Sequence, residues 1–271
     1  MLRILLISLF ASILCAGIEN YQTGTWNLQG SSASSESKWN INVRQIVSGI
    51  GSLDILAIQE AGSLPASMTP TGRFTTTGDF NASEFMWNLG TTSRPQNVFV
   101  YYAQIDRGAN RVNLAIVSRR MADEIFLLPS PSTASRPILG IRIGMDAFFS
   151  AHALANGGTD APAIVHAVDD FFRLRRTDLI DTNWIILGDF NRSPASLLAT
   201  LDLEFRLRAR IISVDTITQV SARATLDYAV VGQSNRTRVP APLPAITATT
   251  ALGLLLSHLT SDHFPVRFGR F

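Results

Sequence analysis

Residues 185–194 read IILGDFNRSP, an apolar run that ends in a cluster of polar side chains. A short apolar run bounded by turn-forming residues is typical of a buried strand, and it predicts one over residues 183–187. Asp189 and Asn191 follow directly after that strand. An Asp or Asn in this position is usually a turn former, so the stretch alone indicates only a strand and a turn.

A similar arrangement recurs at five other places along the chain. In each, a polar side chain stands at or beside the end of an apolar run. These residues are Asn27 in TWNLQG, Glu60 in ILAIQEAG, His152 in FFSAHAL, Asp227 in TLDYAVV, and Asp262 with His263 in TSDHFPV. Together they place carboxylates, amides and two imidazoles at strand ends, where a rigid scaffold positions the loops that carry function.

Apolar periodicity predicts many strands and a few helices. A helix with one buried stripe is predicted by the helical spacing of Trp39, Val43, Ile46, Val47 and Ile50. A second amphipathic helix is predicted over residues 161–173. Strands are predicted at residues 23–28, 53–59, 98–102, 112–118, 125–128, 138–143, 147–152, 183–187 and 226–231. This mixture predicts an α+β sandwich.

The composition excludes several other classes of protein. The 271 residues are 46% hydrophobic and 16% charged, which argues against a disordered tail, a collagen-like repeat or a coiled coil. The formal net charge is only +2, so attraction to a polyanion must be local rather than global. Of the 23 basic residues only Lys38 is a lysine. Arginine forks suit phosphate contacts, but a general arginine bias would give the same composition.

The N-terminus has the pattern of a secretory signal peptide. Arg3 provides a positive start, an apolar run covers residues 4–14, and small residues follow at Ala16 and Gly17. The alternative is a buried N-terminal strand. We therefore expect residues 1–17 to be a signal peptide and residues 18–271 to form one domain, secreted by way of the periplasm. Removal of Cys15 would leave a mature protein without cysteine. The apolar residues 252–256 predict a buried helix or strand.

The series WNLQG, IQEAG, GDFNRSP, LDY and SDHFPV resembles the endonuclease/exonuclease/phosphatase superfamily, which includes DNase I and the abasic-site endonucleases. Longer stretches, among them WNLGTTSRP, GANRVNLAIVSR and AHALANGGTDA, resemble the active subunit of a secreted bacterial genotoxin within that group. The resemblance covers essentially the whole chain after residue 17. It implies a DNase I-like, four-layer αββα sandwich and Mg²⁺-dependent cleavage of DNA in the nucleus of a host cell, causing cell-cycle arrest.

The resemblance also implies a role for each strand-end residue. Glu60 is expected to be the principal metal carboxylate, helped by Asn27 and Asp262. Oxygen ligands of this kind suit Mg²⁺, with Ca²⁺ or Mn²⁺ as alternatives. One position departs from the pattern of several abasic-site enzymes, which have an acidic residue where this chain has Gln29. That departure argues against a second metal ion beside Gln29.

The remaining roles concern the water, the phosphate and the departing oxygen. His263, held by Asp227, is expected to be the general base, because a carboxylate fixes the tautomer of the imidazole and supports its charged form. His152 is expected to stabilise or protonate the departing oxygen, with a carboxylate partner that the sequence does not identify. The residues expected to orient the water and the scissile phosphate are Asp189 and Asn191, and those expected to clamp phosphate oxygens are Arg111 and Arg136.

Other functions remain open at this level. The same superfamily removes phosphates from inositol lipids, so a phosphoinositide (PIP3) phosphatase is an alternative to a nuclease. A free secreted nuclease that degrades DNA for nutrients, and a non-enzymatic carrier, are further alternatives. The toxin resemblance favours DNA as the substrate, and it implies two lectin-like binding subunits that form a heterotrimer with this chain. It implies no stable membrane insertion by the chain itself.

Overall fold

The computed structural model describes residues 17–30, 37–179, 181–234, 243–251 and 261–270. The expected signal peptide, including Cys15, lies almost wholly outside the described residues, and so does the apolar segment 252–256. In the described part of the chain, no helix is long and apolar enough to cross a membrane.

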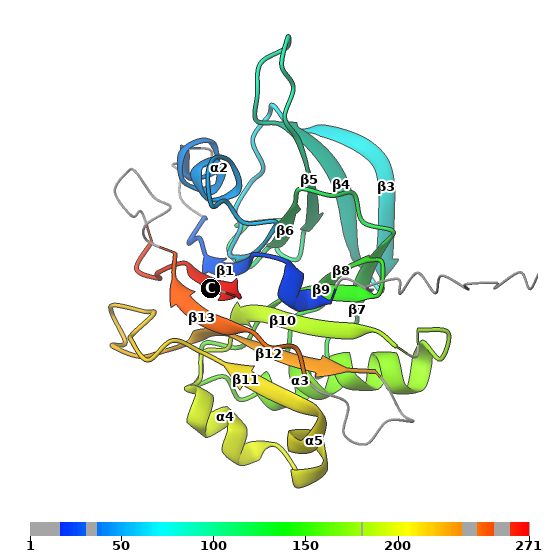
Figure 1. Ribbon diagram of the computed structural model, residues 1–271, viewed down its shortest axis with the longest axis vertical. Helices are drawn as coiled ribbons and strands as arrows, with labels where there is room; N and C mark the ends of the chain where they lie inside the picture. Colours follow the sequence, from blue (N-terminus) through cyan, green and yellow to red (C-terminus); the bar gives the residue numbers. More distant parts are fainter. Residues whose placement is uncertain (1–16, 31–36, 180, 235–242, 252–260, 271) are drawn as a thin grey trace, which may run out of the picture.

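Two β-sheets form the middle of the molecule (Figure 1). The eight-stranded sheet has the order β13-β14-β1-β2-β6-β5-β4-β3, and the six-stranded sheet has the order β11-β12-β10-β9-β8-β7. The strands of the first sheet are β1 (Thr23–Asn27), β2 (Ile55–Gln59), β3 (Thr69–Thr77), β4 (Phe80–Asn88), β5 (Asn97–Ala103), β6 (Leu114–Ser118), β13 (Thr247–Thr250) and β14 (Val266–Gly269). Those of the second are β7 (Glu124–Leu128), β8 (Ile138–Ile143), β9 (Asp146–His152), β10 (Asn183–Asp189), β11 (Ala209–Ile212) and β12 (Asp227–Gln233).

Each sheet has a parallel pair of strands in its interior. In the eight-stranded sheet β1 runs parallel to β2, with Asn27 opposite Gln59. In the six-stranded sheet β9 runs parallel to β10, with His152 opposite Asp189. Parallel neighbours end at the same edge of a sheet, so these pairs bring the polar residues at their carboxyl ends together. β12 is antiparallel to β10 and begins at Asp227, opposite Asp189.

Three apolar cores separate four layers. One lies between the sheets, and each of the other two lies between a sheet and the helices that cover its outer face. Over the eight-stranded sheet lie η2 (Lys38–Val43) and α2 (Arg44–Val47), while over the six-stranded sheet lie α3 (Ala161–Asp170), η3 (Phe171–Arg175), α4 (Pro194–Thr200) and α5 (Leu203–Arg208) (Figure 1). A short helix, η1 (Ile18–Asn20), precedes β1. The predicted αββα sandwich is thus confirmed.

The edge strands β3 and β13 escaped prediction, whereas the edge strand β7 was predicted at residues 125–128. β3 has the sequence TPTGRFTTT and is largely exposed to solvent, so it lacks the apolar alternation that marks a half-buried strand. The same holds for the short edge strand β13, TATT. The predictions also omitted β4, β11, β14, α4 and α5.

One residue of the predicted buried stripe was wrongly placed. Trp39, Val43, Ile46 and Val47 are buried on η2 and α2, as predicted. Ile50 lies beyond the end of α2 and is fully exposed. The helix ends at Val47, and Gly49 adopts a φ of 97°, in the left-handed region that favours glycine. The chain therefore turns away before Ile50 can reach the sheet.

Candidate functional site

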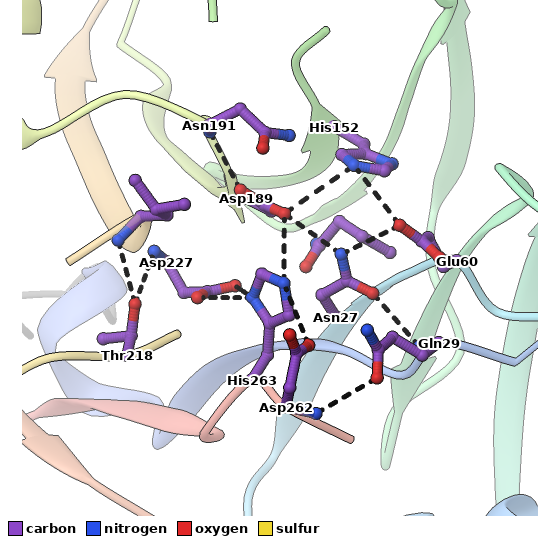
Figure 2. Close-up of polar contacts among 12 residues, drawn as sticks. Asn27, Gln29, Glu60, His152, Asp189, Asn191, Thr218, Asp227, Asp262 and His263 are labelled. Atoms are coloured by element: carbon purple, nitrogen blue, oxygen red, sulfur yellow. Dashed lines mark hydrogen bonds and ion pairs between the residues drawn. The ribbon is translucent and has the colours of Figure 1, made fainter. Parts of the chain in front are cut away.

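A polar cleft of about 430 Å³ opens where the carboxyl ends of β1, β2, β9 and β10 meet. Of the residues predicted to carry function, the cleft is lined by Asn27, Glu60, Arg111, Arg136, His152, Asp189, Asn191 and His263. Asp227 and Asp262 do not line the cleft, but the carboxylate of each contacts the imidazole of His263, as Figure 2 shows. The structure thus brings all ten predicted residues to one place.

His263 is held by Asp227 through a buried hydrogen bond. Nδ1 of the imidazole lies 2.8 Å and 3.1 Å from the two carboxylate oxygens, and Asp227 is fully buried. Burial alone lowers the pKa of His263, but the hydrogen bond and charge of Asp227, with the charges of Asp189 and Asp262, outweigh it and raise the pKa to about 9. Nδ1 is therefore occupied, and Nε2 faces the cleft.

His152 lies across the cleft in a different electrostatic setting. Its Nε2 atom is 3.7 Å from Oε1 of Glu60 and 3.7 Å from Oδ2 of Asp189, beyond hydrogen-bond distance from both. Among the described residues, its buried Nδ1 atom has no hydrogen-bond partner. Burial, followed by the positive charges of Arg136 and His263, holds the pKa of His152 well below its usual value. His152 is therefore neutral near pH 7, whereas His263 carries a proton.

Asp189 stands between the two histidines. Its Oδ2 atom accepts a hydrogen bond of 3.0 Å from Nδ2 of Asn27 and lies 3.8 Å from Nε2 of His263, while Oδ1 accepts from the backbone amide of Asn191. Burial and the neighbouring charge of Asp227 raise the pKa of Asp189 to about 7, against the opposing effect of His263. Asp189, Asp227 and His263 are close enough together to form a group that could hold a metal ion.

The side chains of Glu60 and Asp262 are more exposed to solvent than the side chains of those three residues. Glu60 exposes 26% of its side chain and accepts a hydrogen bond of 3.2 Å from Nδ2 of Asn27. Oδ1 of Asp262 is buried, and no described residue donates a hydrogen bond to it. An acceptor in that state is one that a cation or a water would satisfy. Glu60 and Asn27 line the cleft and Asp262 lies beside His263, and all three offer hard oxygen ligands.

The segment 261–263 is joined to the end of β1 by three hydrogen bonds. Ser261 Oγ donates to the carbonyl of Asn27 at 2.8 Å, the amide of Asp262 donates to Oε1 of Gln29 at 3.1 Å, and Trp26 Nε1 donates to the carbonyl of His263 at 2.9 Å. These bonds bring the C-terminal residues Asp262 and His263 to Asn27.

Lys38 holds the loop that follows β1. Its Nζ atom donates to the carbonyls of Leu28 and Gln29 at 3.0 Å and 2.7 Å. The sequence alone indicated no function for Lys38 or for Gln29. The only available signal was the position of the chain's single lysine shortly after a predicted strand end.

Three residues of the site adopt an uncommon backbone conformation. Gln29, Glu60 and Asn191 have φ values of 49°, 48° and 48°, in the left-handed region that few residues other than glycine enter. Each follows directly or closely on the end of a strand. Such outliers persist where the surrounding structure holds them, and here they turn the chain so that its side chains face the cleft.

The two predicted phosphate-binding arginines differ in their surroundings. Arg111 lines the cleft from the loop before β6. Arg136 also lines it, but its Nη1 atom donates to the carbonyls of His152 and Ala153 at 2.9 Å and 2.8 Å. Nδ2 of Asn191 donates to the carbonyl of Ala153 as well, at 3.0 Å. Arg136 and Asn191 therefore fix the backbone that carries His152, a role that the sequence did not indicate.

A two-sheet sandwich with paired imidazoles and carboxylates at one strand-end cleft defines a DNase I-like hydrolase. The sequence profile of the endonuclease/exonuclease/phosphatase family matches residues 24–263, and the chain belongs to that family. It is thus an enzyme of the endonuclease/phosphodiesterase class, in a family whose members are metal-dependent.

The closer similarities are to one component of a bacterial toxin. The chain is 49% identical over 256 residues to the B subunit of cytolethal distending toxin from Escherichia coli, an alignment that covers 94% of this chain and 93% of that protein. It is 44% identical to a homolog of the same toxin component from Salmonella typhi, over 97% of this chain and 94% of the relative. The crystal structure of the Haemophilus ducreyi cytolethal distending toxin has a chain that superimposes with a TM-score of 0.86 at 46% identity, covering 94% of this chain and 99% of that one. These similarities confirm the resemblance drawn from the sequence.

Proposed function

We propose that this protein is a Mg²⁺-dependent deoxyribonuclease and the catalytic subunit of a secreted genotoxin. The observation that carries the proposal is the pairing of His263 with Asp227 beside the oxygen set of Glu60, Asn27 and Asp262, with His152 across the cleft. This arrangement provides a base held by a carboxylate, ligands for a hard cation and a second imidazole. The similarity to the nuclease-family component of cytolethal distending toxin points to DNA as the substrate.

Glu60 and Asp262, with Asn27, are the residues that fit the metal ion. Their donors are all oxygens, which Mg²⁺ prefers, and the buried Oδ1 of Asp262 has no hydrogen-bond donor among the described residues. The group of Asp189, Asp227 and His263 is less suitable, because Nδ1 of His263 and the carboxylate of Asp227 already bond to each other. When bound, Mg²⁺ would neutralise charge that develops on the phosphate oxygens.

The chain's own residues would move the protons. His263, once neutral, accepts a proton from the attacking water through Nε2, while Asp227 supports the imidazolium that forms. A cation beside Asp262 would offset part of the negative charge that raises the pKa of His263, and so would favour its neutral form. Asp189 and Asn191 would orient the water and the scissile phosphate from the floor of the cleft.

His152 and the arginines would act on the phosphate and the departing oxygen. The low pKa of His152 favours a neutral ring, which would donate a hydrogen bond to the departing oxygen. The departing oxygen would then take up its proton from solvent. Arg111 would neutralise charge on a non-bridging phosphate oxygen. Arg136 would contribute charge to the same phosphate while its Nη1 atom keeps the backbone of His152 in place.

The toxin role implies a route as well as a reaction. Residues 1–17 would direct secretion as a signal peptide, and residues 18–271 would form a single nuclease domain. Two lectin-like binding subunits would assemble with it as a heterotrimer and deliver it to a host cell, where DNA damage in the nucleus would arrest the cell cycle. The relatives in Escherichia coli and Salmonella typhi are themselves named as a component of such a toxin and its homolog.

The experiment is a plasmid-nicking assay on residues 18–271, with Mg²⁺ and with chelator, run beside a phosphate-release assay on PIP3. Mn²⁺ and Ca²⁺ are compared as substitutes. We expect nicking that requires Mg²⁺ and is abolished by the chelator. Phosphate release from PIP3 without nicking would replace the nuclease by the lipid phosphatase. High specific activity on DNA with no partner subunits would favour the free nutrient nuclease.

A further inference from the structure

The cleft is divided between the two sheets. Asn27 and Glu60 come from the ends of β1 and β2 in the eight-stranded sheet, whereas His152 and Asp189 end β9 and β10 in the six-stranded sheet. The two halves of the site therefore keep their geometry only if the sheets keep a fixed position relative to each other. The hydrophobic effect that holds the sheets together is non-directional, so a hydrogen bond between them adds a preferred direction.

A buried polar network joins the sheets directly beneath the cleft. Gln59 is fully buried, at the end of β2, on the face that Ala57 and Ile55 present to the core between the sheets. Its Nε2 atom donates to Ser150 Oγ at 3.1 Å and to the carbonyl of Leu187 at 3.3 Å, both in the other sheet.

The remaining polar groups of Gln59 and Ser150 are hydrogen-bonded as well. Oε1 of Gln59 accepts a hydrogen bond of 3.0 Å from Thr25 Oγ1, and Ser150 Oγ donates to the carbonyl of Ile58 at 3.1 Å. Gln59 thereby uses both of its amide hydrogens and its carbonyl. Hydrogen bonds of this kind have preferred directions and lengths, so they fix a position that apolar contacts leave adjustable.

Every partner of Gln59 stands two positions before a residue of the site. Alternate residues of a strand share a face, so each of these pairs lies in line along the same side of its strand. The pairs are Thr25 with Asn27, Ser150 with His152, and Leu187 with Asp189.

We infer that Gln59 is a positioning residue that holds the two halves of the site in register, an inference that rests on the proposed nuclease function. Gln59 is fully buried and is not among the residues that line the cleft. It acts through the strands that carry His152 and Asp189, and its loss would displace these residues relative to Asn27 and Glu60. A displacement of this kind lowers the rate of the chemical step more than it weakens the binding of DNA.

The test substitutes Gln59 by Met, which keeps the length and shape of the side chain and removes its hydrogen bonds. We expect kcat for plasmid nicking to fall about tenfold or more, with KM and the Mg²⁺ midpoint changed by less than about twofold. The matched control is Ser234→Ala. Ser234 is equally buried, and its Oγ atom accepts from the amide of Thr182 and donates to the carbonyl of Leu179 at the opposite end of the six-stranded sheet. The control should lose thermal stability and keep its kcat.

Two further measurements make the result decisive. If Gln59→Met does not fold, Ser150→Ala removes one acceptor of Gln59 and should lower kcat about threefold, again without a change in KM. The imidazole resonances of His152, recorded by NMR at one pH in metal-free protein, should shift in Gln59→Met and stay in place in Ser234→Ala. This readout needs no catalysis, so it decides the role of Gln59 even if the parent protein does not nick DNA, a result that would refute only the nuclease. A kcat for Gln59→Met or Ser150→Ala that falls no further than that of Ser234→Ala, or an unmoved His152 resonance, would overturn the inference.

Discussion

Nδ2 of Asn27 donates a hydrogen bond of 3.0 Å to Oδ2 of Asp189, and the two residues belong to different sheets. The same nitrogen lies 3.2 Å from Oε1 of Glu60. One amide therefore separates two carboxylates that would otherwise repel each other across the cleft. The side-chain oxygen Oδ1 of Asn27 accepts a hydrogen bond from the backbone amide of Gln29 and retains a second lone pair for a cation.

Replacing Asn27 by Asp should damage the site more than its small change in size suggests. The substitution removes both hydrogen bonds of Nδ2 and adds a negative charge beside Glu60 and Asp189. We expect nicking at saturating Mg²⁺ to fall by at least about 100-fold, and the free energy of unfolding to fall by about 1–3 kcal/mol, the usual cost of an unsatisfied buried polar group. Denaturant unfolding and nicking rates measure the two effects. Parent-like nicking by Asn27→Asp would contradict this account of the site.

His263→Ala should abolish nicking while the fold survives. The ring lies at the cleft, and general-base catalysis contributes about 10²–10⁴-fold to the rate. Asp227→Asn should reduce activity strongly but less completely, because Asp227 holds the imidazole and does not itself take the proton from water. Circular dichroism serves as the control for folding. If purified His263→Ala nicks DNA at the parent rate, His263 is not the base.

The Asp227 contact should be visible in the titration of His263. In metal-free protein, NMR should give His263 a pKa of about 9, and Asp227→Asn should lower it because the hydrogen bond and charge of Asp227 are what raise it. The folded pKa lies above the unfolded value of about 6.5. The pairing therefore stabilises the fold fully below about pH 6.5, and this stability is lost as the pH rises through about 9. Added Mg²⁺ should lower the pKa. A value near 6.5 in both proteins would refute the pairing.

Glu60→Gln should weaken the binding of metal without removing the reaction. The substitution lowers the charge of the ligand set and keeps its shape, so the Mg²⁺ midpoint for nicking should rise and activity should recover partly at high Mg²⁺. His152→Ala provides the contrast, since its loss should not be rescued by any concentration of Mg²⁺. Identical midpoints for Glu60→Gln and the parent would argue against Glu60 as a metal ligand.

The sequence predicted the centre of the fold better than its edges. The strands that became β2, β9 and β10 are largely apolar runs because both of their faces are buried. The edge strand β3 is mostly polar and exposed, and only its pairing with β4 makes it a strand. A pattern based on local periodicity cannot detect such a strand, because the information lies in the partner.

In the candidate site, too, the sequence predicted what depends on local pattern and missed what depends on distant partners. Residues such as Glu60 and Asp189 were found because each ends an apolar run, a feature of the local sequence. The sequence could not identify the carboxylates beside His152, since Glu60 and Asp189 approach it from strands far away in the chain. For the same reason it gave Arg136 a contact with phosphate alone, while the structure adds two hydrogen bonds to the backbone of β9 and the residue after it.

The last prediction concerns delivery. The purified protein, residues 18–271, should cut DNA in a tube and leave intact cells unharmed when added alone, because its small net charge offers little long-range attraction to a cell surface. Mixed with the two proposed binding subunits, it should co-elute with them on gel filtration and produce DNA damage and arrest at the G2/M boundary in treated cells. His152→Ala is the matched control, because it should assemble in the same way and cause no arrest. If the chain does not co-elute with the candidate subunits, and harms cells no more with them than without them, the toxin assembly is refuted and the nutrient nuclease takes its place.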